Sequence, residues 1–315
     1  MTIRESSPTD RPPVLAIIPH YGATAETVAC VDSLFEAEYT SLHILIVDNS
    51  GNLVPDEFRT QVEVLVPGHN VGYCRACNIG IERAIERGID YVLFVNNDTR
   101  TPQGTIEALV DTLAADSDAA GVGPLLTTQC GDCIWSAGSF FRFGPNEVRQ
   151  RGLGRPLVSA PPYPDFVDFL PGAFALYKTA DLGAIGGLDE DYFMYLDDAD
   201  LGVRLKQRGR RLLYLPWVQA DHGGSLASGG GVTPLRKFLS GVNTPRLLLR
   251  AGSIKLWVSF LAFDIIGLLP SILLHVWDPC RLRAQLAKGR GLVLGLRGYR
   301  AGPKDVQHYT APRRR

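Results

Sequence analysis

Short apolar runs alternate with longer segments of helical periodicity over the first 125 residues. Runs of mostly apolar, β-prone residues predict strands at 14–18, 43–47, 62–66 and 91–95. Apolar residues that recur every three or four positions predict helices at 24–36, 73–87 and 102–115. This alternation predicts an α/β fold of Rossmann-like type, with a mostly parallel central sheet flanked by helices.

Polar side chains follow four of the predicted strands. The clusters are Pro19-His20-Tyr21, Asp48-Asn49-Ser50, His69-Asn70 and Asn96-Asn97-Asp98. Any one of them could be ordinary turn chemistry, because Asn and Asp are common in turns. Parallel strands end at one edge of a sheet, however, and ligands of open α/β sheets bind there. Four such clusters therefore predict a ligand site. The first strand is followed by no Gly-x-Gly-x-x-Gly sequence, which argues against a dinucleotide dehydrogenase.

A less regular region, 126–178, comes next. Apolar residues alternate from Phe166 to Tyr177 around Pro171-Gly172, and this pattern predicts mixed strands that complete the sheet and form the wall of a pocket.

Six carboxylates then crowd the twelve positions from Asp189 to Asp200, interleaved with four large apolar or aromatic residues. A helix is predicted over 198–208, with Leu201 on its buried face and Arg204 exposed. Asp197 and Asp198 would lie at its N-terminus, where negative charge is favourable. N-capping alone would also explain them.

Residues 254–277 form an apolar run with Trp257 and Trp277 near its ends. Its length could span a bilayer, but Asp264 and Pro270 make a span less favourable. A pair of helices lying in the cytoplasmic interface of a membrane fits the pattern best. A true span and a packed soluble helix remain alternatives.

Composition adds a charge asymmetry to this pattern. The 315 residues are 45% hydrophobic and 21% charged, which are globular values. The net charge is −1, but residues 236–315 hold 15 Lys/Arg and 3 Asp/Glu, leaving 17 basic and 30 acidic residues in 1–235. A basic tail indicates an anionic partner. Because long apolar runs separate its basic residues, a membrane surface is favoured over nucleic acid.

The domain organisation follows from these patterns. Residues 1–13 are polar, lack the apolar segment of a secretory signal and are predicted to be a disordered lead-in. Residues 14–235 form the predicted α/β domain and 236–315 a basic, apolar helical tail. We expect a cytoplasmic protein, peripheral on the inner face of the cell membrane.

Six cysteines include two Cys-x-x-Cys pairs, which are Cys74 with Cys77 and Cys130 with Cys133. Four thiolates could hold zinc, but 52 residues separate the pairs. Reduced, structural thiols are the favoured interpretation.

Several motifs in this order resemble family 2 glycosyltransferases, most closely the bacterial rhamnosyltransferase-like branch. They are Asn70-Val71-Gly72-Tyr73 through Asn78, Asn96-Asn97-Asp98, Gly186 to Glu190, Phe193 to Leu201, and more loosely His222-Gly223-Gly224-Ser225. The resemblance covers 14–225. It implies a GT-A fold and inverting transfer of a sugar, rhamnose favoured, from a nucleotide-diphosphate sugar. The acceptor would be a hydroxyl of a lipid-linked glycan, in cell-surface polysaccharide synthesis.

The resemblance also implies roles for individual residues. Asp198 would be the catalytic base with Asp197 as its orienting neighbour, and Asp98 and His222 would bind Mg²⁺ or Mn²⁺. The implied nucleotide-sugar contacts are Pro19, Tyr21, Asp48, Asn70, Gly72, Asn78, Asn96 and Asn97. Arg75 is a further candidate for phosphate, and Trp135 for stacking on a sugar. The family's first Asp of Asp-x-Asp is Asn96 here, which weakens the expected metal site.

Two other functions stay open. A nucleotidyltransferase has a similar sheet, but it would require a Gly-rich, Arg-containing loop after the first strand. This sequence has Pro19-His20-Tyr21-Gly22 there. A non-catalytic, membrane-associated protein that binds glycans or nucleotides is the second alternative. The presence together of Asp98, Asp197, Asp198 and His222 argues against it.

Overall fold

The computed structural model describes residues 11–55, 58–59, 61–223 and 233–310. Most of the predicted lead-in, residues 1–10, lies outside this range, as do Gly224 and Ser225. Arg11 is described, and its guanidinium pairs with the carboxylates of Glu107 and Asp111.

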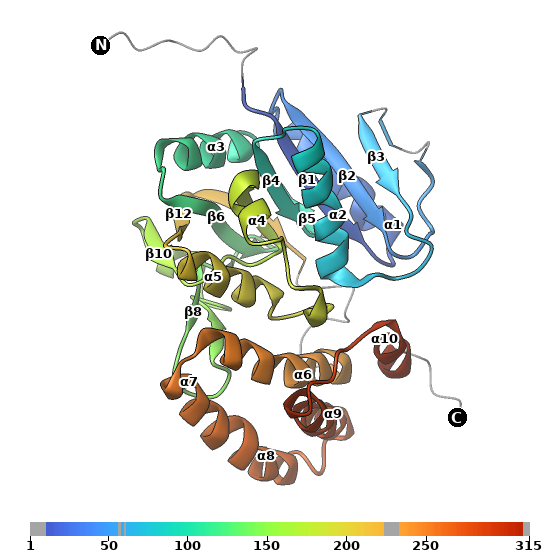
Figure 1. Ribbon diagram of the computed structural model, residues 1–315, viewed down its shortest axis with the longest axis vertical. Coiled ribbons are helices and arrows are strands. Elements are labelled where there is room, and N and C mark those ends of the chain that lie inside the picture. Colours follow the sequence, from blue (N-terminus) through green and yellow to red (C-terminus); the bar gives the residue numbers. More distant parts are fainter. Residues whose placement is uncertain (1–10, 56–57, 60, 224–232, 311–315) are drawn as a thin grey trace.

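A ten-stranded sheet forms the centre of the molecule (Figure 1). The strand order is β10-β12-β6-β11-β4-β1-β2-β3, with β5 beside β12 and β7 beside β6. The strands are β1 Val14–His20, β2 Leu42–Asp48, β3 Val62–Leu65, β4 Tyr91–Val95, β5 Thr99–Arg100, β6 Ala119–Thr128, β7 Ile134–Ser136, β10 Asp165–Val167, β11 Phe174–Lys178 and β12 Arg211–His222. The four strands predicted in the first half are confirmed to within two residues at each end.

Parallel pairing joins β1 to β2 and β4, β2 to β3, and β6 to β12. Between these two parallel groups, β11 runs antiparallel to both β4 and β6. The sheet therefore has a Rossmann-like half completed by mixed strands, as the pattern around Pro171-Gly172 predicted.

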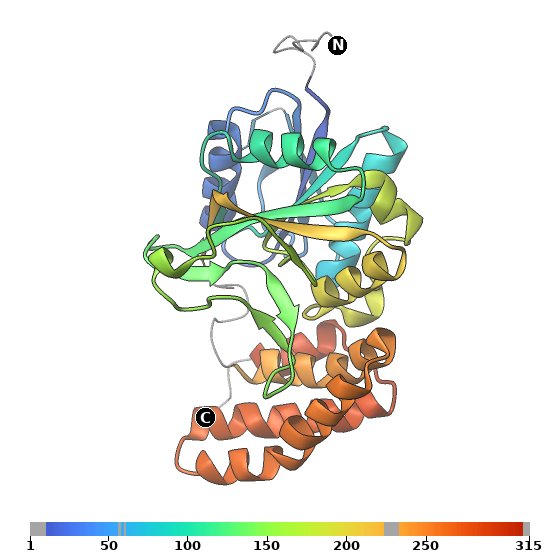
Figure 2. The same cartoon turned by 90° about the vertical axis from the view of Figure 1, so that its left-hand side faces the viewer.

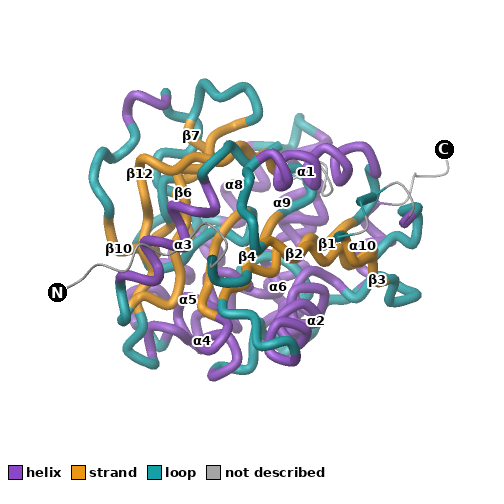
Figure 3. Tube along the Cα trace, turned by 90° about the horizontal axis from the view of Figure 1, so that it is seen from above, coloured by secondary structure: helices purple, strands orange, loops and turns teal. Residues whose placement is uncertain are grey.

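Helices cover both faces of the sheet. Helices α1 (Thr24–Glu36) and α3 (Thr105–Ala115) share one apolar core with Val14, Ala16 and Ile18 of β1. On the other face, Leu15 and Ile17 share a core with α2 (Gly72–Glu86), α4 (Thr179–Ala184) and α5 (Asp197–Gln207). Seen from above, α1 and α2 lie on opposite sides of the band of strands (Figure 3). Alternate residues of β1 thus face opposite helical layers, as expected for a buried parallel strand.

Two local differences from the sequence pattern have a backbone cause. Helix α3 begins at Thr105 and not at Pro102, because Gly104 has a φ of 75°, which a helix interior cannot contain. The strand β5 was not predicted, because two residues carry no recognisable period.

The C-terminal helices pack beneath this domain (Figures 1 and 2). They are α6 (Pro234–Ala251), α7 (Ile254–Ser259), a π-helix (Phe260–Ile266), α8 (Leu268–Leu274), α9 (Pro279–Leu296) and α10 (Pro303–Thr310). Glycines let α6 and α9 approach closely, since a Cβ on Gly241 would lie 2.7 Å from the carbonyl oxygen of Lys288. A hairpin of β8 (Ser139–Phe141) and β9 (Val148–Gln150) extends from the sheet towards these helices (Figure 2).

The apolar run forms one continuous helix over Ile254–Leu274, where a pair of helices was expected. The turn before Pro270 is π-helical, and the amide of Gly267 donates to the carbonyl of Ala262 at 3.1 Å. This wider turn carries the chain past Pro270 without a break. The helix is long and apolar enough to cross a membrane, and 22% of its most apolar window is buried inside the protein.

Candidate active site

A cleft of about 210 Å³ lies at the carboxyl edge of β1, β2 and β4. Each of the four polar strand-end clusters contributes at least one residue to its lining. Nine residues that the sequence predicted for the site line the cleft, namely Pro19, Tyr21, Asn70, Gly72, Asn96, Asn97, Asp98, Asp197 and Asp198. Trp135, the candidate for sugar stacking, also lines it.

Asp48, Asn78 and His222 are not among the residues that line the cleft. The buried carboxylate of Asp48 accepts hydrogen bonds from the amides of Ser50, Gly51 and Leu53, at 2.9, 2.8 and 3.0 Å. It therefore fixes the turn after β2. Its neighbour Asn49 lines the cleft instead.

Asn78, on α2, anchors the loop at the start of the acidic segment. Its side chain donates to the carbonyl of Leu188 at 2.9 Å and accepts from the amide of Leu188 at 2.8 Å. It also donates to Glu190 at 3.0 Å. Arg75 pairs with Glu82 and Glu190 at 2.5 and 3.2 Å, and it does not line the cleft.

The end of β4 meets the end of β12 at the floor of the cleft. The Nε2 atom of His222 lies 3.2 Å from Oδ1 of Asp98 and 3.1 Å from Nδ2 of Asn96. Asp98 and His222 are both nearly inaccessible, at 4% and 1% exposed. The ring of Trp135 packs on the imidazole at a centroid distance of 4.2 Å. The side-chain amide of Asn97 donates to the hydroxyl of Thr27 at 3.0 Å.

The separation of Asp98 and His222 is compatible with two ligands of one divalent ion as well as with a direct ion pair. Ligands about 2.1 Å from an ion and at right angles to each other are about 3.0 Å apart, close to the 3.2 Å between these two atoms. Among the described residues, no group of three or more His, Cys, Asp or Glu side chains is placed to hold a metal. An ion here would therefore need oxygens from a ligand or water to complete its shell.

On the opposite wall, the loop before Asp197 adopts an unusual backbone. Phe193, Tyr195 and Leu196 have φ values of 58°, 73° and 65°, a region that non-glycine residues rarely occupy. The carbonyl of Phe193 accepts from the amides of Tyr73 and Cys74 at 2.8 and 3.3 Å. Gly72 makes this contact possible, since a Cβ there would lie 2.8 Å from the carbonyl oxygen of Phe193.

Asp197 and Asp198 follow this loop at the first turn of α5. Burial raises the pKa of both carboxyls above the usual aspartate range, and the charge of Asp198 raises that of Asp197 further. Asp198 accepts from the amide of Ala199 at 2.8 Å. The nearby charge of Arg236 acts against the rise in the pKa of Asp198. Such a carboxylate, kept weakly acidic beside a cleft, suits a general base.

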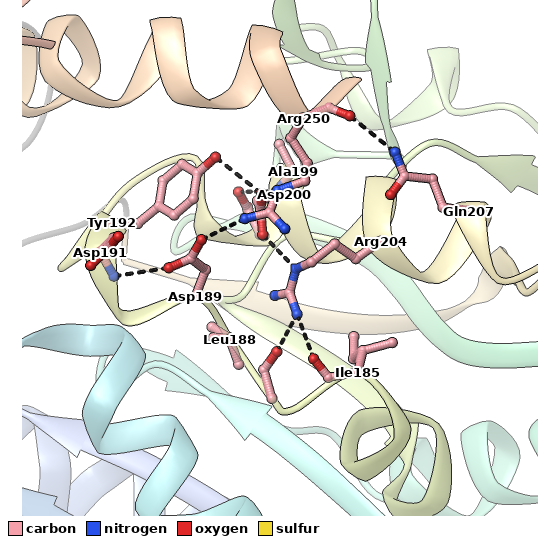
Figure 4. Close-up of polar contacts among 12 residues, drawn as sticks. Ile185, Leu188, Asp189, Asp191, Tyr192, Ala199, Asp200, Arg204, Gln207 and Arg250 are labelled. Atoms are coloured by element: carbon pink, nitrogen blue, oxygen red, sulfur yellow. Dashed lines mark hydrogen bonds and ion pairs between the residues drawn. The ribbon is translucent and has the colours of Figure 1, made fainter. Parts of the chain in front are cut away.

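Asp189 and Asp200 of the acidic segment are held in ion pairs (Figure 4). Buried Asp200 accepts from Arg204 at 2.6 Å and from the hydroxyl of Tyr192 at 3.1 Å. Arg250 of α6 pairs with Asp189 at 2.8 Å and lies 3.4 Å from Asp200. Arg204 was predicted to be exposed, but its side chain is only 11% exposed because it also donates to the carbonyls of Ile185 and Gly187.

The cysteines lie on separate elements. Cys74 and Cys77 are buried in α2 within the core, whereas Cys130 and Cys133 lie in the turn between β6 and β7.

Comparison with known proteins agrees with this geometry. The sequence model of "Glycosyl transferase family 2" matches residues 15–163. The N-acetylglucosaminyl-diphospho-decaprenol L-rhamnosyltransferase of Mycobacterium tuberculosis is 31% identical over 236 residues, which cover 68% of this chain and 76% of that protein. The chain belongs to glycosyltransferase family 2. As a glycosyltransferase, it is neither a nucleotidyltransferase nor a non-catalytic binding protein.

Solved structures show the fold of this family 2 glycosyltransferase. A mannosyltransferase from Pyrobaculum calidifontis, solved with GDP-Man and Mn²⁺, superposes with a TM-score of 0.55 at 16% identity, over 92% of this chain and 88% of that one. GalNAc-T7, solved with UDP, GalNAc and Mn²⁺, gives 0.55 at 14% identity, over 86% of this chain and 59% of that one. The predicted GT-A fold is confirmed.

Several residues of the cleft were not predicted from the sequence. Leu235, Arg236 and Val306 come from the C-terminal helices, and Gln150 from the hairpin. Neither a motif nor a period marks them. Only the structure shows that the helical tail forms one wall of the site.

Proposed function

We propose that this enzyme transfers a sugar, rhamnose favoured, from a nucleotide-diphosphate sugar to a hydroxyl of a lipid-linked glycan, with inversion, in cell-surface polysaccharide synthesis. One observation carries the proposal. Asp98, which contacts His222, lines one side of the cleft, and the pair Asp197–Asp198 lines the opposite side. The relative from Mycobacterium tuberculosis supports the choice of rhamnose and of a lipid-diphosphate acceptor.

The polar side of the cleft, at the ends of β1, β2 and β4, would bind the donor. Pro19, Tyr21, Asn49 and Asn70 surround the end that the nucleotide would occupy. Asp98 and His222 would hold Mg²⁺ or Mn²⁺, which when bound neutralises charge on a departing diphosphate. The Mn²⁺ in both solved GT-A structures supports this assignment.

Asp198 would then act on the acceptor. Its carboxylate removes the proton of the acceptor hydroxyl while that oxygen forms a bond to the anomeric carbon of the donor. The bond from this carbon to the diphosphate oxygen breaks, and the electron pair leaves with the nucleoside diphosphate. Asp197 would be the orienting neighbour of Asp198. Burial raises the pKa of the Asp198 carboxyl and so makes its carboxylate more basic.

The outer helix would rest on a membrane at its cytoplasmic face. Ile266, Leu269 and Leu273 project from it and are 72%, 63% and 64% exposed. Its one acidic residue, Asp264, is buried and pairs with Lys288 of α9. This inward ion pair ties the helix to the protein, which supports an interfacial position over a span. Exposed basic residues near it, including Lys255, Arg281 and Arg283, would each add about 1 kcal/mol of attraction to anionic lipid.

A transfer assay tests the proposed function. Purified enzyme with Mg²⁺ or Mn²⁺ should convert dTDP-rhamnose and an N-acetylglucosaminyl-diphospho-lipid into a rhamnosylated lipid with inverted configuration. Nucleotide sugars that bind should also raise the melting temperature by mass action. No transfer and no thermal stabilisation with dTDP-, UDP- or GDP-sugars would contradict the proposal.

A further inference from the structure

The wall of the cleft around the catalytic base is an apolar cluster made by the C-terminal helices. Phe193 of the loop packs with Leu235 of α6 and Val306 of α10, and Met194 and Tyr195 pack against them. All five residues also line the cleft. The end of the cleft beside Asp198 is therefore apolar, whereas the end at β1, β2 and β4 carries amide and carboxylate groups.

One cationic side chain stands in this apolar wall. Among the described residues that line the cleft, Arg236 is the one Lys or Arg. Its guanidinium lies over the ring of Tyr195 at 5.7 Å from the centroid. It is near enough to Asp198 for its charge to act on that carboxyl. Stacking of this kind fixes the plane of the guanidinium, whose planar fork matches the oxygens of a phosphate.

We propose that Arg236 binds the diphosphate of the lipid-linked acceptor, with the apolar wall beside it receiving the first units of the lipid. This inference rests on the proposed function and identifies the part of the acceptor that the C-terminal helices recognise. The sugar of such an acceptor lies between its hydroxyl, which Asp198 must reach, and its diphosphate. A cation close to Asp198 is thus placed one sugar away from the reacting oxygen.

A diphosphate is present in the donor as well, but the layout favours the acceptor. In the proposed function, Asp98 and His222 would hold the divalent ion that serves the donor diphosphate, and Asp98 lines the cleft at the end of β4. Arg236 lies on the side of the cleft that carries Asp198, together with residues of the loop that leads into Asp197. An arginine also suits an anion that is not neutralised by an ion, because its fork matches phosphate oxygens.

Steady-state kinetics with two acceptors tests the inference in the full chain. One acceptor carries N-acetylglucosamine on a diphosphate with a long alkyl chain. The other carries the same sugar and chain joined directly as an uncharged glycoside. Arg236→Gln should lower kcat/KM about 10- to 100-fold for the diphosphate acceptor. It should lower kcat/KM for the uncharged acceptor by a clearly smaller factor, through the loss of its charge beside Asp198. It should change the donor KM by less than about threefold, and the kcat/KM of Arg236→Lys for the diphosphate acceptor should fall between those of the wild type and Arg236→Gln. Arg208→Gln, an exposed arginine outside the cleft, is the matched control.

Each other result counts against the inference. Equal losses on both acceptors would show that Arg236 acts through Asp198 or the loop. A rise in the donor KM would assign Arg236 to the donor diphosphate. Unchanged kinetics in Arg236→Gln, with active wild-type enzyme, would overturn the inference and leave the proposed function intact. A wild-type enzyme that uses neither acceptor would overturn both.

Discussion

The three left-handed residues before Asp197 are held in place from the neighbouring helix α6. The Nδ2 group of Asn243, which is fully buried, donates to the carbonyls of Tyr192, Met194 and Tyr195 at 3.0, 3.0 and 2.9 Å. A backbone in this region persists only where its surroundings determine it. We therefore expect Asn243 to position the loop that leads to Asp198, the proposed base.

Replacing Asn243 should lower turnover more than binding. Asn243→Ala removes the amide that bonds all three carbonyls, so the loop relaxes and Asp198 shifts relative to the acceptor. Misplacement of a reacting group by about 1 Å can cost about 100-fold in rate. We expect kcat to fall about 10- to 100-fold while the donor KM changes less than about threefold, measured by initial rates.

Gln207→Ala provides the matched control, because its amide bonds to α6 at the carbonyl of Arg250 and not to the loop. A proportional loss of activity and melting temperature in both variants would show that Asn243 is only structural.

The carboxylates of the acidic segment show how far single residues could be predicted. Their residue types and the motif indicated Asp197 and Asp198 as catalytic. The sequence could not tell that Asp189 and Asp200 are held by Arg250, since that arginine lies far along the chain in what was read as a separate tail. Asp48 and Asn78 were predicted to contact the nucleotide sugar, and that assignment stays a prediction. Their side chains bond to the turns around them.

At the scale of elements, a buried polar cluster joins the outer helix to the hairpin of the cleft. Ser259 exchanges hydrogen bonds with the backbone of Gly144 at 2.8 and 3.1 Å. Glu147, 5% exposed, lies beside Asp264. Burial, and then the charge of Asp264, raises the pKa of Glu147 to about 7. Gln150, three residues after Glu147 and at the end of β9, lines the cleft.

This cluster predicts a pH dependence of stability. The folded pKa of Glu147 is higher than the unfolded value of about 4.3. The folded state then binds more protons between these values, so stability is full below about 4.3 and falls as the pH rises to about 7. Glu147→Gln, which cannot ionise, should make the melting temperature depend less on pH over this range and should raise it at pH 8.

Thermal melts from pH 4.5 to pH 8 measure the effect. Glu86→Gln, on an exposed glutamate of α2, is the control and should keep the wild-type profile. An identical pH profile in Glu147→Gln and wild type would contradict the assignment.

Elements were predictable where period and length agreed, as in β1 to β4 and the helices α1 and α2. The continuity of the helix over Ile254–Leu274 was not, because Pro270 reads as a break and the π-helical turn that accommodates it leaves no sequence signal.

At the scale of the whole molecule, the exposed apolar helix lies on the side farthest from the sheet, with α6 and α9 between them (Figures 1 and 2). Replacing Ile266, Leu269 and Leu273 with Ser should therefore weaken binding to anionic lipid vesicles at least about 10-fold, because apolar area no longer leaves water. Sedimentation with phosphatidylglycerol vesicles measures this binding.

The control variant replaces Val54, Val66 and Val158, which are exposed on the catalytic domain, with Ser. Equal binding by the two variants would contradict docking through the helix. Resistance of the wild type to extraction from membranes at alkaline pH would instead indicate a span.

The central claim is that Asp198 is the base of a sugar transfer in the cleft that it shares with Asp98. The most direct measurement is the transfer rate of Asp198→Asn, which keeps the shape of the side chain and removes its basicity. The account predicts a loss of at least about 100-fold in kcat, with donor binding by thermal shift unchanged. Activity within a few-fold of the wild type would contradict it.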